Sequence, residues 1–168
     1  ELSIKLHNRF PQGPHLTAVS KKSLKHRTGP YRFYAPVYDR VFAPSFSEGH
    51  QKMYQSLNLE EDDRILEVGV GTGVSLAFCP DFVQVDGIDF SDSMLSQARR
   101  KLDNGGIGGN VVLTKMDAHE LEFDDNTFDH SLVAHALAVV SKPDKVLSEM
   151  KRVTKVGGKI CIVNHYSK

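Results

Sequence analysis

Residues 64–73 read Arg-Ile-Leu-Glu-Val-Gly-Val-Gly-Thr-Gly, and this stretch decides the fold that the sequence predicts. Its apolar first half, which ends near the acidic Glu67, is typical of a short buried strand. Its second half carries three alternate glycines: Gly69, Gly71 and Gly73. Glycine has no Cβ and adopts positive φ readily, so such a turn lets a ligand lie against bare backbone. The stretch therefore predicts a strand that runs into a ligand-binding turn and then a helix.

The residue that follows these glycines narrows the class of ligand. A dinucleotide-binding fingerprint has its third glycine three residues beyond the second, where this chain has Val74. The spacing therefore disfavours a nicotinamide-dependent oxidoreductase.

A second acidic residue closes the next apolar strand. Asp89 lies at the carboxyl end of the strand expected over 83–90, sixteen residues after Gly73. A carboxylate at that place can accept hydrogen bonds from both hydroxyls of a ribose. Asp86 is the alternative, but it lies three residues further inside the strand. We therefore expect Asp89 to hold the sugar of a nucleoside.

Neighbouring residues could complete a nucleoside site. Phe90 and Met94 offer apolar surface to a base, although both could belong to the core, and Ser91 can cap the helix that follows. Asp117 and Ala118 follow the third expected strand. Asp117 could accept a hydrogen bond from the exocyclic amine of adenine, with room for the ring left by Ala118. The alternative for Asp117 is a carboxylate that caps a loop.

Expected strands and helices alternate from residue 64 onward. The strands cover 64–68, 83–90, 111–116, 128–134 and 159–164, and the helices begin at Gly73 and cover 91–102 and 143–154, with a shorter one over 51–57. A Gly-Gly pair at 157–158 is expected to end the last helix. This alternation predicts an α/β fold with a doubly wound, mostly parallel sheet.

The glycine turn, the acid after the second strand and the Asp-Ala pair occur in the order found in class I S-adenosylmethionine (SAM) methyltransferases, which this chain resembles. The resemblance implies a Rossmann-like sheet and SAM as cofactor. It implies that Glu67 orients the glycine turn and the cofactor's amino group. Members of this class usually finish with another helix and an antiparallel strand pair, and that C-terminal pair is expected to be absent here.

Within that class the chain most resembles bacterial phosphatidylethanolamine N-methyltransferases, from about Tyr31 to Tyr166. The segments that carry this resemblance are 38–42, 66–73, 87–91 and 162–165. The Tyr-Asp segment at 38–39 also occurs in quinone-biosynthesis C-methyltransferases, which remain an alternative. A non-catalytic SAM-binding module is a further one.

Charge is distributed unevenly along the 168 residues, although Lys and Arg balance Asp and Glu at 21 each. The first 32 residues carry seven Lys or Arg and one acid, so the remainder is mildly acidic. We expect residues 1–50 to form a basic arm and helical cap, with an amphipathic stretch at 15–26, ahead of a SAM-binding domain over 51–168. The arm could bind an anionic membrane surface. No nucleic-acid recognition module is visible.

Two cysteines in apolar contexts, Cys79 and Cys161, indicate reduced core residues of a cytoplasmic protein. Together with the basic arm, they predict a cytoplasmic location, peripheral at the inner face of the membrane. No stretch approaches the length of an apolar membrane span.

A phospholipid amine could attack the methyl group directly, without a metal. Its ammonium form titrates near 10, about as a lysine does, so a proton must leave first. Candidate proton acceptors are two histidines after the fourth and fifth strands and two tyrosines of the cap: His135, His165, Tyr34 and Tyr38. The tyrosine rings could also attract a sulfonium or a methylated ammonium.

Overall fold

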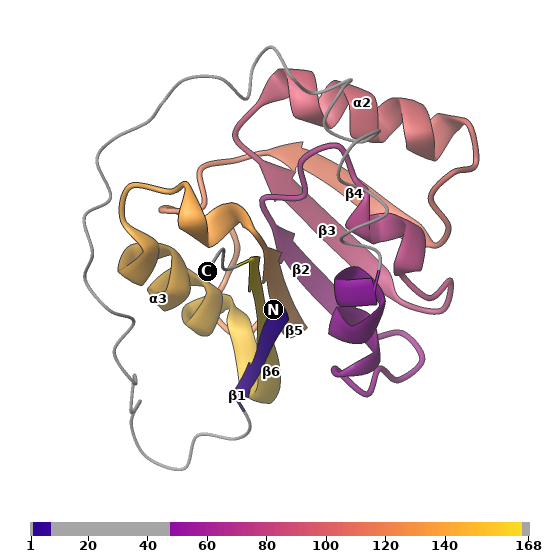
Figure 1. The fold of residues 1–168 in the computed structure, drawn as a ribbon. Helices are drawn as coiled ribbons and strands as arrows, with labels where there is room; N and C mark the ends of the chain where they lie inside the picture. Colours follow the sequence, from indigo (N-terminus) through magenta and orange to yellow (C-terminus); the bar gives the residue numbers. More distant parts are fainter. Residues whose placement is uncertain (1, 8–47, 166–168) are drawn as a thin grey trace.

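The protein, described here from a computed structural model over residues 2–7 and 48–165, is built on one six-stranded sheet (Figure 1). The sheet order is β1-β6-β5-β2-β3-β4, and every neighbouring pair is parallel except β1 with β6. The strands are β1 (Leu2–His7), β2 (Arg64–Val68), β3 (Gln84–Asp89), β4 (Asn110–Lys115), β5 (Phe128–Ala134) and β6 (Thr154–His165). The expected doubly wound, mostly parallel sheet is confirmed.

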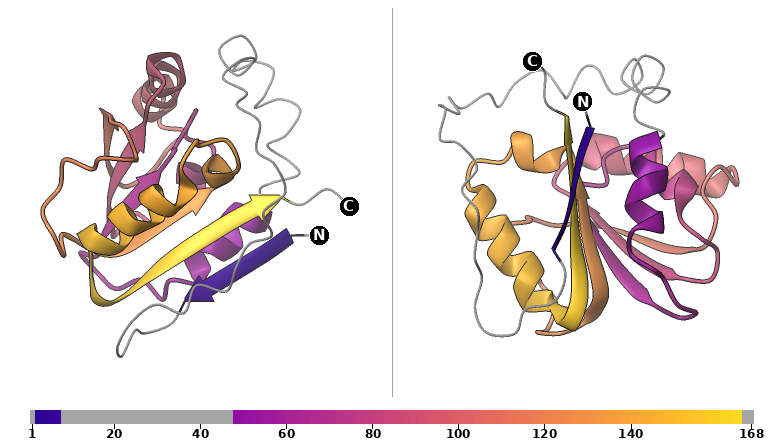
Figure 2. Two further views of the ribbon diagram at one scale, coloured as in Figure 1. Left: turned by 90° about the vertical axis from the view of Figure 1, so that its left-hand side faces the viewer. Right: turned by 60° about the horizontal axis from the view of Figure 1, so that its bottom comes forward.

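Helices cover both faces of this sheet (Figure 2). A helix over 48–55, the short 3-10 helix η1 (Ser75–Phe78) and α2 (Asp92–Asp103) lie on one face. On the other face lies α3 (Pro143–Val153). Ile65 belongs to the core of the first face and its neighbour Leu66 to that of the second, because successive strand residues point to opposite sides. A strand buried on both faces explains the continuous apolar run at the start of the glycine motif.

Most predicted element bounds hold within a residue or two. β2 and β5 match their predictions, and α2 begins after Ser91, whose Oγ accepts a hydrogen bond from the Met94 backbone N–H. The prediction of a helix directly from Gly73 is wrong in extent, since only one 3-10 turn forms, over Ser75–Phe78.

The start of β6 differs from the prediction. The strand begins at Thr154, directly after α3, instead of at residue 159. Thr154 pairs with Phe128 and Lys159 with His130, so the glycine pair lies in an irregular segment of the strand. Gly157 has a φ of +91°, which other residues rarely adopt. The glycines therefore shape a bulge inside the strand and do not end the helix.

The edge strand β1 comes from the segment that we expected to be part of the basic arm. Residues Leu2–His7 pair antiparallel with Ile160–His165. The sequence Leu-Ser-Ile-Lys-Leu-His alternates apolar and polar residues, which is a strand signal that the interpretation as an arm overlooked. The sheet thus has an antiparallel strand beside β6, and residues Leu2–His7 supply it. Among the described residues, no helix has the length and apolar character needed to cross a membrane.

Candidate functional site

The glycine turn follows β2 at the carboxyl edge of the parallel strands, where open α/β sheets bind ligands. Gly69, Gly71 and Gly73 have φ values of +71°, +56° and +75°, so all three use the freedom that glycine has. The backbone N–H groups of Gly69 and Val70 both donate to the Ile88 carbonyl, at 2.8 and 2.9 Å. The turn is therefore tied to the end of β3.

Only one of the three glycines borders open space. A Cβ on Gly69 would collide with the Ala136 side chain, and a Cβ on Gly73 would lie 3.0 Å from Ile107 Cδ1. A Cβ on Gly71 would meet none of the described atoms within 4 Å. Packing therefore requires the outer two glycines, whereas Gly71 leaves its backbone open to a ligand.

Asp89 lies beside this opening. Its Oδ2 accepts a hydrogen bond from the Gly71 N–H at 2.9 Å, and its Oδ1 accepts one from the Ser91 N–H at 2.8 Å. Burial raises the pKa of Asp89, while these backbone donors oppose the rise. Each carboxylate oxygen can accept a further hydrogen bond. The structure thus brings Asp89 and Gly71 together, and the ribose contact remains a prediction.

The alternative acid, Asp86, has another partner. Its Oδ2 lies 2.8 Å from Arg64 Nε in a partly buried ion pair between β3 and β2. Asp86 lies in the middle of β3, away from the carboxyl edge, and its side chain is engaged by Arg64, which favours Asp89 as the ribose acceptor.

The residues after Asp89 present the apolar surface that the sequence predicts. Phe90 is 72% exposed directly after the strand, which is unusual for a large apolar side chain. Met94 is half-buried on the first turn of α2. The Ser91 Oγ caps α2 by accepting the Met94 N–H, so Ser91 would contact a ligand through its backbone.

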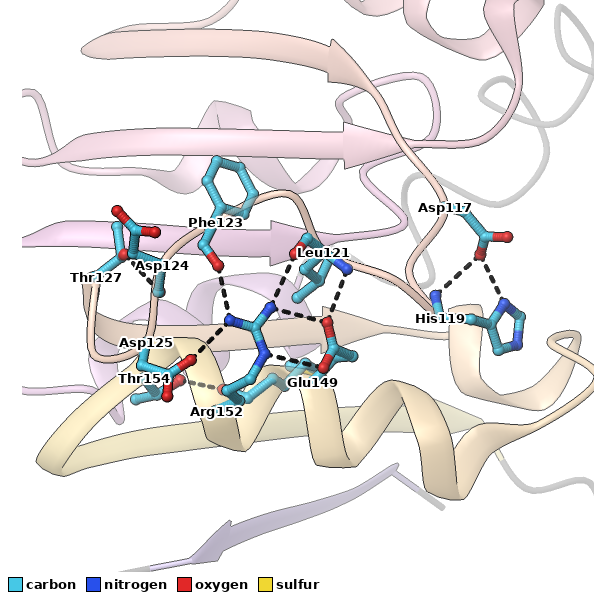
Figure 3. Close-up of polar contacts among 11 residues, drawn as sticks. Asp117, His119, Leu121, Phe123, Asp124, Asp125, Thr127, Glu149, Arg152 and Thr154 are labelled. Atoms are coloured by element: carbon cyan, nitrogen blue, oxygen red, sulfur yellow. Dashed lines mark hydrogen bonds and ion pairs between the residues drawn. The ribbon is translucent and has the colours of Figure 1, made fainter.

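Asp117 forms a local cluster with His119 (Figure 3). Its Oδ1 accepts the His119 backbone N–H at 2.9 Å and lies 2.6 Å from His119 Nδ1. These contacts lower the pKa of Asp117, the backbone hydrogen bond most and the ring contact next. Ala118 packs against the core of the α3 face. Sequence reasoning did not identify His119.

Glu67 lies beneath the turn and is only 1% exposed. Its carboxylate accepts hydrogen bonds from Tyr54 Oη, at 2.8 Å, and from Ser75 Oγ. Burial raises its pKa to about 7, against the effect of these two hydrogen bonds. The acid thus ties the helix over 48–55 to the segment after the turn. These contacts fit the expected role of Glu67 in orienting the glycine turn. A contact between Glu67 and a cofactor amino group remains a prediction.

Two histidines pack together at the carboxyl end of β5. The His135 ring meets the His50 ring edge to face, with 5.8 Å between centroids. His135 has a φ of +61°, and its backbone N–H donates to the Val163 carbonyl at 2.7 Å. His50 is 5% exposed, and burial is the main reason why its pKa falls to about 4, with His135 adding to the effect. No local pattern points to His50, because its contact with His135 joins segments 85 residues apart.

The remaining candidates are only partly described. Tyr34 and Tyr38, like the stretch at 15–26, lie outside the described residues. The backbone of His165 ends β6 opposite Leu2. Among residues 2–7 and 48–165, no group of three or more His, Cys, Asp or Glu side chains is arranged to hold a metal ion.

Comparison with known proteins places this arrangement in a family. A model of the methyltransferase domain matches residues 66–162. A phosphatidylethanolamine N-methyltransferase from Cereibacter sphaeroides is 48% identical over 132 residues, 79% of this chain and 64% of the relative. A ubiquinone/menaquinone biosynthesis C-methyltransferase UbiE from Idiomarina loihiensis is 41% identical over 104 residues, 60% of this chain and 41% of the relative. The chain thus spans less than two thirds of these relatives.

A solved structure of a SAM-dependent methyltransferase from Aquifex aeolicus matches with a TM-score of 0.67 and 27% identity, over 81% of this chain and 77% of that one. The glycine turn with its positive φ angles and the parallel sheet agree with these matches. The chain belongs to the methyltransferase domain family and has the Rossmann-like fold of class I SAM-dependent methyltransferases.

Proposed function

We propose that this chain forms the cofactor-binding part of a methyltransferase that transfers methyl groups from SAM to the amine of phosphatidylethanolamine. The observation that carries the choice of acceptor is the 48% identity over 132 residues to a phosphatidylethanolamine N-methyltransferase. Family membership supports the coarser part, a SAM-dependent methyltransferase.

The residues around the glycine turn offer groups that SAM could use. Gly71 leaves open space beside its backbone, Asp89 offers carboxylate oxygens to ribose hydroxyls, and Phe90 exposes a ring to a base. Asp117 has a carboxylate oxygen for an exocyclic amine. When bound, SAM supplies an electrophilic methyl group on its sulfonium. The protein's contribution is to hold two reactants in line, which removes the entropic cost of bringing them together.

The acceptor amine must be neutral when it attacks. In this proposal His135, directly after β5, takes the proton at an imidazole nitrogen. Burial keeps His50, which packs against it, neutral above pH values of about 4. A neutral neighbour adds no positive charge that would oppose protonation of His135.

Access to a lipid acceptor would come through the basic arm. Each Lys or Arg near an anionic membrane surface contributes about 1 kcal/mol to binding. In this proposal the protein works at the inner face of the membrane, with the arm on the headgroups and the carboxyl edge of the sheet facing the lipid amine. The arm beyond residue 7 lies outside the described residues.

A second candidate is methylation of a quinone ring carbon. The 41% identity to a UbiE C-methyltransferase favours it, and such an acceptor would need no ammonium deprotonation.

The test supplies the protein with methyl-labelled SAM and vesicles of phosphatidylethanolamine, phosphatidylcholine or phosphatidylglycerol, and separately with a demethylated quinone precursor. We expect label in methylated phosphatidylethanolamine, and none in the other lipids. Label in the quinone alone would replace the proposal by the second candidate. Binding of S-adenosylhomocysteine with no transfer to any acceptor would leave a non-catalytic SAM-binding module.

A further inference from the structure

The turn after β4 holds Asp117 in an unusual way. One carboxylate oxygen, Oδ1, takes both contacts from His119, the backbone N–H at 2.9 Å and Nδ1 at 2.6 Å. The other oxygen, Oδ2, makes no hydrogen bond to any described residue, and the Asp117 side chain is 52% exposed. Figure 3 shows this second oxygen pointing away from the His119 ring.

We propose that His119 is a positioning residue for cofactor recognition: it holds Asp117 through Oδ1, so that Oδ2 is free to act as the acceptor for the exocyclic amine of adenine. The inference rests on the proposed function only in taking SAM as the ligand. It does not depend on the methyl acceptor.

The ring of His119 is largely buried. Its side chain is 22% exposed, and its Nε2 atom is buried without a hydrogen-bond partner among residues 48–165. With Nδ1 directed at the carboxylate, Nδ1 is the donor and the buried Nε2 carries the lone pair in the neutral ring. A proton on Nε2 instead would bury an unpaired N–H, which costs free energy, so the surroundings of the ring favour Nδ1 as the donor.

The loop that carries His119 is clamped to α3 (Figure 3). Arg152 donates to the carbonyls of Leu121 and Phe123 at 2.8 and 2.7 Å. Glu149 accepts the Leu121 N–H at 2.8 Å and pairs with the same guanidinium. These bonds begin two residues after His119. The hydrogen bonds therefore anchor the segment that follows the imidazole to α3.

Preorganisation of this kind makes recognition selective. A carboxylate held in one orientation accepts the adenine amine without an ordering cost. The backbone N–H of residue 119 would remain if the ring were removed, so Asp117 would stay in place but could rotate. The loss should therefore be confined to ligands that carry the amine.

Isothermal titration calorimetry with two ligands tests this directly. One ligand is S-adenosylhomocysteine, and the other is its 6-deamino analogue, in which the purine carries hydrogen in place of the amine. The variants are His119→Ala, His119→Asn, whose amide can replace the Nδ1 donor, and Glu120→Ala, an exposed neighbour in the same turn, as the matched control.

We expect His119→Ala to bind S-adenosylhomocysteine about three- to tenfold more weakly than wild type, as for the loss of one hydrogen bond, and to bind the deamino analogue unchanged. His119→Asn should recover part of the affinity, and Glu120→Ala should match wild type. In the free wild-type protein, the ¹⁵N shifts of the His119 ring should indicate protonation at Nδ1.

Other results would overturn the inference. Equal losses for both ligands would mean that His119 only supports the loop, and no loss for either would mean that it does nothing for recognition. In both cases the proposed function would stand. If wild type and Glu120→Ala fail to bind S-adenosylhomocysteine at all, the cofactor assignment falls, and this inference falls with it.

Discussion

At the scale of single residues, Gly69 and Gly71 have similar backbones and different surroundings. Both have positive φ, but only at Gly69 would a Cβ collide with a neighbour, the Ala136 side chain. A residue with a Cβ is strained at positive φ, so replacing either glycine costs about 1–2 kcal/mol of stability. The two positions therefore separate folding from ligand binding.

We expect Gly69→Ala to lower the melting temperature more than Gly71→Ala does, because steric collision adds to backbone strain. Gly71→Ala should fold and lose most of its affinity for S-adenosylhomocysteine, since its methyl group enters the space beside the turn. Thermal denaturation and calorimetry would measure the two effects. Equal affinity in Gly71→Ala and wild type would show that the ligand lies elsewhere.

Glu67 should make stability depend on pH. Burial raises its pKa in the folded protein from 4.5 to about 7, so between these values the folded state holds more protons than the unfolded state. Its contribution is therefore fully present below 4.5 and is lost as the pH rises through about 7. Glu67→Gln, which resembles the protonated acid, should remove this loss.

The measurement is the free energy of unfolding in urea at several pH values between about 5 and 8 for both proteins. His50 acts in the opposite direction: its pKa is lowered to about 4, so its contribution is lost as the pH falls from 6.5. The difference between Glu67→Gln and wild type isolates Glu67. A difference that does not vary with pH would contradict the buried, titrating acid.

At the scale of elements, β1 protects the edge of β6. Six residue pairs join the strands, Leu2 with His165 through His7 with Ile160. Deleting residues 1–7 should lower the melting temperature and promote self-association, because an open strand edge pairs with other chains. Thermal denaturation and analytical ultracentrifugation would detect both changes. A monomer with unchanged melting temperature would show that β6 does not need this partner.

Elements whose signal is local could be predicted from the sequence. β2, the glycine turn and the acid that ends β3 each depend on a few adjacent residues, and all three lie where expected. The start of β6 could not be predicted in this way, because a glycine pair after a helix also fits a helix end. Gly158 lies in a bulge beside β5, where a Cβ would collide with the Asp129 carbonyl. Only the packing of β6 on β5 creates this requirement.

The contacts that complete the site could not be predicted from patterns of adjacent residues. Tyr54 and Ser75 bind Glu67 from the helices that precede and follow β2 in the chain, and the partner of His135 lies on the helix over 48–55. The sequence predicted each acid or histidine as a candidate. It could not predict their partners, because those contacts form only when distant segments pack.

At the scale of the whole molecule, basic charge gathers ahead of the domain. Replacing the five Lys and Arg residues between 9 and 27 by Gln removes this charge and leaves β1 intact. At about 1 kcal/mol for each charge near an anionic surface, binding to phosphatidylglycerol vesicles should fall by orders of magnitude. Affinity for S-adenosylhomocysteine should not change. Vesicle sedimentation with equal retention of both proteins would contradict a membrane role for the arm.

The most direct measurement of the central claim is calorimetric titration of S-adenosylhomocysteine into wild type, Asp89→Ala and Asp86→Ala. If the nucleoside rests on the glycine turn with its ribose on Asp89, wild type binds and Asp89→Ala loses about 10- to 100-fold in affinity, as for hydrogen bonds to a charged group. Asp86→Ala, which breaks only the Arg64 ion pair, should bind as wild type does. Equal affinity of Asp89→Ala and wild type, or no binding by wild type, would contradict the claim.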